Sequence, residues 1–281
     1  MRISQFTSAT PASRTAVPAR PEQPAEPQET FSPGQTSRRA TVAKITGAGC
    51  VLAGGIAAAR IAAEVASAPG VAAKVALGAG VVASAAAGLM AADFTSGVFH
   101  WAIDNYPNEN TPLVGGIAKE FQNHHDTPSM DHVSVWENVA PAATAMVGPM
   151  AALAIFTPHP MLAAAGLAFT GGAVLAQASH RWSHMSNPPT TARVLQKLGI
   201  SQTSANHAKH HTDPFDEYYC IVNGKFNPLL TRTNFWRKME KGVHKITGAE
   251  PNSWKDPKVK ALAMGEVTKA ELLREAASPD R

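Results

Sequence analysis

The sequence predicts an all-α integral membrane protein, a helical bundle of about four transmembrane helices with a histidine-rich cytosolic cap and a disordered N-terminal tail. Three observations predict this fold class. The 281 residues are 44% hydrophobic and only 16% charged. The apolar residues gather in Ala/Gly/Val-rich blocks between residues 45 and 178, with polar sequence on either side. Ten of the eleven histidines fall between His100 and His211.

The first 40 residues are rich in Pro, Ser, Thr, Gln and Ala and contain almost no large apolar side chain. Such a segment cannot bury enough surface to offset its conformational entropy, so we expect residues 1–40 to be a disordered tail. We expect the membrane domain at residues 41–255. Residues 256–281 are expected to form a C-terminal tail with a short helix.

Four apolar segments predict the membrane spans: residues 45–59, 75–92, 139–156 and 161–178. The last three have 18 residues each, close to the roughly 20 that cross a bilayer. The first is shorter because Arg60 follows it, and this side chain has to reach an interface. The Thr-Pro-His-Pro sequence that ends at Pro160 predicts the tight turn of a helical hairpin. A soluble bundle of Ala-rich helices is the alternative.

The distribution of basic residues predicts the orientation of the chain. Four spans place the N-terminus, residues 93–138 and everything after Ser179 on one side. Six Lys and Arg residues precede Ile45 and 16 follow Ser179, whereas the opposite loop contains only Arg60 and Lys74. The positive-inside rule therefore predicts that the common side, with both termini, is cytoplasmic.

The spacing of the histidines predicts a metal site on that side. His180 and His184 are one helical turn apart, and the HAKHH sequence that ends at His211 would gather three imidazoles on one helical surface. Asp104 and His132 are expected to support the ligands without binding metal. We predict no catalytic residue apart from the ligands. The predicted ligands are His100, His124, His125, His180, His184, His207, His210 and His211.

The number of ligands indicates two metal ions. A closed site takes four ligands, so eight imidazoles suit two first-row metals with room left for water or oxygen. Cys50 and Cys220 form no metal-type pair, so thiolates are not expected as ligands. The net charge of +4 is accompanied by no zinc-finger spacing or basic repeat, and we expect no nucleic-acid partner.

Four motifs resemble the plasmanylethanolamine desaturase family, whose lipid desaturase domain is also called Kua. They are DFTSGVFHWAID at residues 93–104, KEFQNHHDTP at 119–128, HRWSH at 180–184 and HAKHH at 207–211. The resemblance covers residues 75–255. It implies a membrane di-iron enzyme that uses O2 and two electrons to remove two hydrogens from a membrane phospholipid. In the best-known members this forms the vinyl ether bond of plasmalogens from an alkyl ether phospholipid.

The resemblance leaves alternatives open. A plant branch of the superfamily desaturates an acyl chain instead, and a hydroxylase could use the same scaffold. A non-enzymatic metal- or haem-binding membrane protein is a more remote reading. The basic and aromatic residues between Phe226 and Lys241 predict a segment lying on anionic headgroups. They could also receive an acidic electron donor such as a cytochrome b5 or a ferredoxin.

Overall fold

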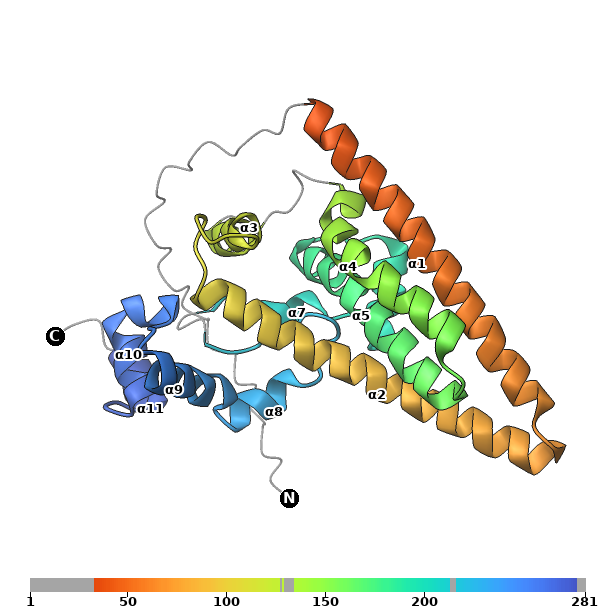
Figure 1. The fold of residues 1–281 in the computed structure, drawn as a ribbon. Coiled ribbons are helices and arrows are strands. Elements are labelled where there is room, and N and C mark those ends of the chain that lie inside the picture. Colours follow the sequence, from red (N-terminus) through yellow and green to blue (C-terminus); the bar gives the residue numbers. More distant parts are fainter. Residues whose placement is uncertain (1–32, 127, 129–133, 213–215, 277–281) are drawn as a thin grey trace, which may run out of the picture.

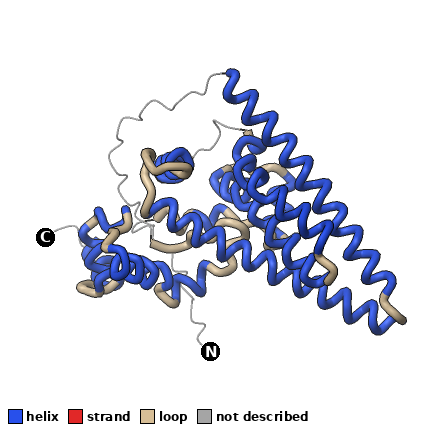
Figure 2. The backbone as a smooth tube through the Cα atoms, viewed as in Figure 1, coloured by secondary structure: helices blue, strands red, loops and turns tan. Residues whose placement is uncertain are grey.

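The computed structural model describes residues 33–126, 128, 134–212 and 216–276, which form helices and loops without any strand (Figure 2). The predicted all-α fold is thus confirmed. The elements in chain order are α1 (Pro33–Ser67), α2 (Gly70–Asn105), α3 (Gly115–Asp126), α4 (Val135–Phe156), α5 (Pro160–His184), α6 (Thr190–Lys197), α7 (Ser204–His207), α8 (Asn227–Arg232), α9 (Phe235–Thr247), the 3-10 helix η1 (Asn252–Lys255), α10 (Pro257–Met264) and α11 (Lys269–Ala276).

Four of the described helices, α1, α2, α4 and α5, are long and apolar enough to cross a membrane, as the sequence predicts. They are longer than the predicted segments because the helical conformation continues through the polar turns at their ends. Helix α1 already begins at Pro33, inside the predicted tail, because nothing after Gly34 interrupts it. The rest of that tail, residues 1–32, lies outside the described residues.

The four long helices pack as two pairs that share the hairpin of α4 and α5. Helix α1 packs on α4 and α2 packs on α5, while α1 and α2 diverge from the turn at Ala68 and Pro69 (Figure 1). The predicted hairpin is confirmed, since α4 ends at Phe156 and α5 begins at Pro160.

The contact between α2 and α5 depends on glycines. A Cβ atom at Gly88 would overlap the carbonyl oxygen of Ala165, and one at Gly172 would lie 2.7 Å from the Cβ of Ala92. The two backbones can therefore approach only because these positions lack side chains. This close packing sets the relative height of the two helix ends that carry histidines.

The sequence predicts that the Arg60 side chain reaches a membrane interface, whereas in the structure it binds the C-terminal end of α4. Its guanidinium donates hydrogen bonds to the carbonyl oxygens of Ala154 and, at 3.3 Å, Thr157. These carbonyls belong to the last turn of the helix and its cap, where intrahelical donors are missing. The charge that shortens the first apolar segment thus joins α1 to α4.

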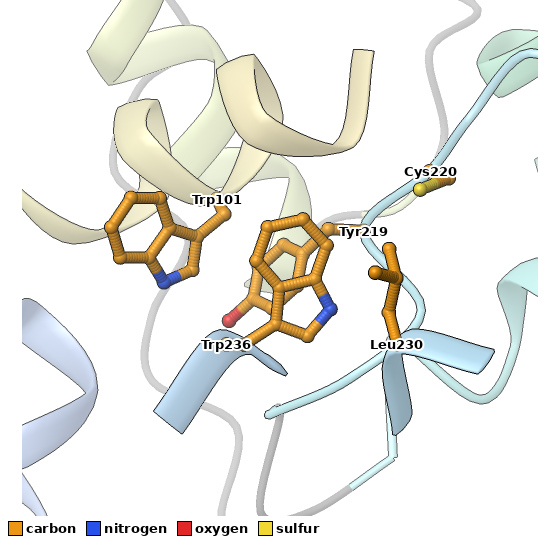
Figure 3. Packing of buried hydrophobic residues seen from close by; sticks show 5 residues of the cluster. All are labelled: Trp101, Tyr219, Cys220, Leu230 and Trp236. Carbon is orange, nitrogen blue, oxygen red and sulfur yellow. The ribbon is translucent and has the colours of Figure 1, made fainter. Parts of the chain in front are cut away.

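The smaller helices gather at the C-terminal end of α2, where α3 and α9 to α11 surround it (Figure 1). Here Trp101, Tyr219, Cys220, Leu230 and Trp236 form a buried cluster (Figure 3). Trp236, which belongs to the segment that the sequence predicts to lie on lipid headgroups, is buried in this cluster instead. Trp236 is buried because α2 presents a large apolar side chain to it, and the local sequence pattern does not reveal this contact.

Candidate metal centre

The eight predicted histidine ligands converge with Asp104 on one end of the bundle. His100 and Asp104 come from the last two turns of α2, and two adjacent histidines come from the end of α3. His180 and His184 close α5. The remaining three lie at α7 and in the turn after it. The ligand atoms of these nine side chains form two groups: His124, His180, His184, His207 and His211 in the first, and His100, Asp104, His125 and His210 in the second. His132 lies outside the described residues.

The first group is a ring of five imidazoles. The Nε2 atom of His180 lies 3.1 Å from that of His124 and 3.3 Å from that of His184. The Nε2 atom of His207 lies 2.9 Å from that of His184 and 3.1 Å from that of His211. Nitrogens bound at right angles to one metal at about 2.1 Å would lie about 3 Å apart. The five nitrogens are therefore close enough together to bind one ion.

The second group is built around the Asp104 carboxylate. Its Oδ2 atom lies 3.2 Å from His100 Nε2, 3.3 Å from His125 Nε2 and 3.5 Å from His210 Nε2. The sequence suggests a supporting role for Asp104, whereas this position gives it the same access to a bound ion as the three imidazoles. The two groups thus differ in charge, because only the second contains an anion.

Backbone carbonyls orient several of the rings. The Nδ1 atoms of His100 and His210 each lie 3.0 Å from a carbonyl oxygen, that of Tyr219 and that of Glu217 respectively. His124 makes the same contact through Nδ1 with the carbonyl of Phe121. A carbonyl only accepts, so each Nδ1 must carry the proton and each Nε2 keeps its lone pair for a metal.

Burial supports the metal interpretation. The Nε2 atoms of His100 and His210 and the Oδ1 atom of Asp104 are buried and make no hydrogen bond. Unpaired buried polar atoms cost about 1–3 kcal/mol each, and bound cations would satisfy them. Burial, followed by the neighbouring histidines, also lowers the pKa of His207 and His211 below the ordinary value. These rings are therefore neutral at pH 7, as ligands must be. The nine side chains fit metal binding.

The sequence predicts that HAKHH gathers three imidazoles on one helical surface, but the structure does not show this arrangement. Helix α7 ends at His207, and the amide of His210 then donates to the His207 carbonyl at 2.9 Å in a tighter turn. This turn sends His210 toward the second group, while His207 and His211 remain in the first. One short motif therefore contributes to both groups.

Asp93 is a residue that ligand spacing does not find. Its fully buried carboxylate accepts three backbone N–H groups, from Asn223 at 2.9 Å, Gly224 at 2.8 Å and Phe226 at 3.2 Å. The segment 216–227, which we call the strap, is thereby held along α2. The strap includes the carbonyls that orient His100 and His210. A carboxylate inside an otherwise apolar helix is the signal in the sequence.

Taken together, four apolar helices and two metal-type groups at their ends define a histidine-rich helical membrane protein. Residues 89–254, more than half of the chain, match the model of the lipid desaturase domain family. The chain belongs to this family, and the resemblance seen in its motifs is confirmed. No solved structure matches the chain.

Relatives from distant organisms are similar to part of this chain. Fatty acid desaturase 4-like 1 of Arabidopsis thaliana is 34% identical over 177 residues, which are 61% of this chain and 59% of that protein. The plasmanylethanolamine desaturase of Myxococcus xanthus is 30% identical over 175 residues, 58% of this chain and 60% of the relative. Plasmanylethanolamine desaturase 1 of Mus musculus is 26% identical over 179 residues, 59% of this chain and 66% of the relative. The chain thus spans about three fifths of the length of the first of these.

Proposed function

We propose that this protein is an O2-dependent lipid desaturase that uses two iron ions. The observation that carries the proposal is the pair of ligand groups at the ends of α2 and α5, five imidazoles in one and three imidazoles with a carboxylate in the other. Imidazole-rich sites without thiolates suit iron that changes its oxidation state. Family membership adds the lipid as substrate class.

The reaction balances with one O2 and two external electrons. A –CH2–CH2– unit of the lipid loses two hydrogen atoms and becomes –CH=CH–. Together with two electrons and two protons, these hydrogens reduce O2 to two H2O. Side-chain acids and bases cannot break an unactivated C–H bond, so bound iron would supply the oxidising power. The protein contributes ligands, orientation and a binding surface.

The depth of the ligand groups indicates which part of the lipid reacts. His100 and Asp104 lie in the last two turns of α2, and His180 and His184 lie in the last two turns of α5. We therefore place the site at the headgroup end of the hydrocarbon region, near the first carbons of a lipid chain. This position suits a bond next to the headgroup better than one in the middle of a chain.

Two phenylalanines point to the side from which the lipid approaches. Phe121 packs against His100 with ring centroids 5.3 Å apart and against His180 at 6.0 Å. Phe121 also packs against Phe99, at 6.1 Å, which is 44% exposed on the surface of α2. These two rings form a continuous apolar contact from the exposed surface of α2 to both ligand groups, and we propose that the reacting chain lies along it.

The bond proposed first is the vinyl ether of plasmalogens. An alkyl ether chain carries its reacting carbons next to the glycerol, which agrees with the depth of the site, and the Myxococcus and mouse relatives are named for this activity. The second candidate is an acyl chain desaturated near its carboxyl end. It is supported by the Arabidopsis relatives, which are named fatty acid desaturases.

Lipid mass spectrometry separates these candidates. Cells that express the protein should gain a lipid lighter by two hydrogens, and cells that express His184→Ala should not. Mild acid releases an aldehyde from a vinyl ether but leaves an acyl double bond intact. A product heavier by one oxygen would identify a hydroxylase, and an unchanged lipid profile would contradict the proposal.

A further inference from the structure

A continuous series of aromatic rings leads from α9 to the second ligand group. The ring of Trp236 lies 5.0 Å from that of Tyr219. The Tyr219 ring lies in turn 4.7 Å from His210 and 5.7 Å from His100. Trp101 also stacks on Trp236, with ring centroids 6.0 Å apart, and Figure 3 shows the three aromatic residues in the cluster. Only one residue, Tyr219, thus separates Trp236 from two ligand candidates.

The outer surface of α9 is strongly basic. Lys238, Lys241 and Lys245 are exposed and spaced so that they share one side of the helix. The acidic residue of α9, Glu240, is fully buried and is bound by Arg237 at 2.5 Å. The exposed surface of α9 therefore carries three positive charges and no negative one. Trp236 lies two positions before Lys238, on the opposite, buried side of the helix.

We propose that this lysine surface of α9 docks an acidic one-electron carrier protein, and that Trp236 and Tyr219 pass its electrons to the metal held by the second group. The inference deepens the proposed function, because it rests on two irons that must be reduced. Each encounter transfers one electron and oxidises the carrier by one. Two encounters supply the two electrons that O2 reduction requires beyond those from the lipid.

The connections around Tyr219 favour this route. The Tyr219 ring touches His210 and His100, and the Tyr219 carbonyl also accepts the N–H of His100 at 3.0 Å. One residue therefore contacts the second group through both its side chain and its backbone.

An ion-pair network holds α9 against this route. Arg237 pairs with Glu240 and, at 3.5 Å, with Asp216 at the start of the strap. Glu240 also accepts hydrogen bonds from Trp254 Nε1 at 3.1 Å and Ser253 Oγ at 3.3 Å. The docking helix and the strap that carries Tyr219 thus form one rigid unit. Rigid packing preserves the ring contacts on which fast electron transfer depends.

Charge complementarity favours a protein over a membrane as the occupant. An anionic membrane would satisfy the lysines but would have no use for the buried aromatic route beneath them. An acidic carrier would use both the lysines and the aromatic rings. Opposite charges raise the rate of encounter, and the rings shorten the distance over which each electron passes to the metal. Phe121 lies on the side from which we propose that the lipid approaches. Tyr219 contacts His100 independently of Phe121 and leads to Trp236 in α9 instead.

The test measures reduction of the iron-loaded, full-length protein in nanodiscs of neutral phosphatidylcholine. Two probes are mixed with it in an anaerobic stopped-flow instrument, a reduced acidic [2Fe–2S] ferredoxin and the reduced soluble haem domain of cytochrome b5. Carrier absorbance reports the transfer. With at least one probe, the second-order rate constant should fall steeply as salt increases. Failure of both probes to reduce the iron at low salt would overturn the proposal.

Charge reversal separates docking from general electrostatics. Replacing Lys238, Lys241 and Lys245 by Glu should lower the second-order rate constant at low salt by about tenfold or more. The matched control reverses three exposed basic residues elsewhere, Arg38, Arg193 and Lys197, and should change it less than about twofold. Equal effects of the α9 substitutions and the control substitutions would contradict docking at a specific surface. Unchanged reduction together with weaker binding of the α9 variant to phosphatidylglycerol vesicles would assign the lysines to the membrane.

Substitutions in the route test the electron path itself. Trp236→Leu and Tyr219→Leu should slow transfer at saturating carrier, whereas Trp236→Phe and Tyr219→Phe should keep most of the rate because a packed ring remains. Iron content and reduction by dithionite should stay unchanged in the Phe variants. If these Leu variants keep their iron and the wild-type transfer rate, the route is refuted. Absence of dithionite-reducible iron in the wild type would instead refute the proposed function.

Discussion

His124 and His125 are neighbours in the chain, yet their ligand nitrogens belong to different groups. His124 Nε2 lies 3.1 Å from His180 Nε2 in the first group, and His125 Nε2 lies 3.3 Å from Asp104 Oδ2 in the second. Successive residues of a helix point about 100° apart, so the end of α3 reaches both groups at once. The two ring centroids are only 4.6 Å apart. The two ligand groups are therefore adjacent.

The first prediction concerns metal content. The purified protein should bind about two irons per chain, because the nine ligand atoms form two separate groups. His184→Ala, in the first group, should lower this to about one and abolish desaturation. His159→Ala, in the exposed turn between α4 and α5, is the control and should keep both. Elemental analysis decides the matter, and a single zinc without iron would contradict the two-iron proposal.

The second prediction tests whether Asp104 is a ligand. Asp104→Asn keeps the size of the side chain but removes the only anion of the second group. We expect loss of about half of the iron and of the corresponding Mössbauer signal, together with at least about a hundredfold lower activity. If Asp104 only supported His100, the variant would retain both irons with slightly altered spectra. The spectrum therefore separates ligand from support.

The third prediction concerns the strap. Asp93→Asn replaces a carboxylate oxygen by an NH2 group that faces backbone donors, so one hydrogen bond is lost and two donors meet. We expect a loss of about 1–3 kcal/mol in stability and weaker binding of the iron in the second group, whose His100 and His210 depend on the strap carbonyls. Glu266→Gln, on an exposed loop, is the control. Unchanged thermal unfolding in detergent would count against the role of Asp93.

The fourth prediction concerns the packing of α2 on α5. Gly88→Ala should destabilise the protein by about 1–3 kcal/mol, since the new methyl group overlaps the backbone of α5. Displacing α5 also moves His180 and His184 away from the other ligands, so activity should fall with stability. Gly171→Ala, in α5, meets nothing within 4 Å and should have little effect. Thermal unfolding of both variants gives the comparison.

The fifth prediction concerns membrane topology. Single cysteines introduced at Asn108, Asn187 and Lys255 should be labelled from one side of the membrane, and one at His159 from the other; all four positions are exposed. We propose that the common side is cytoplasmic, as are both termini. The native Cys50 and Cys220 are buried and give little background. Labelling of Asn108 and Asn187 from opposite sides would separate the ligand groups and refute a common site.

The sequence by itself determined the helical membrane bundle, the hairpin turn before Pro160 and the set of eight histidines. These features follow from local rules: apolar length sets a span, proline ends a helix, and residues one turn apart share a side. The same rules found the pair His180 and His184 as well as the proximity of Asp104 to His100.

Only the tertiary structure decided how the ligands divide into two groups. The turn after His207 sends His210 away from His207 and His211, and the position of Asp104 among three imidazoles depends on α3 and the strap arriving from 20 to more than 100 residues away in the chain. The burial of Trp236 likewise depends on α2. Contacts of this kind join segments that are distant in the chain, and the periodicity of a single segment contains no information about its partner.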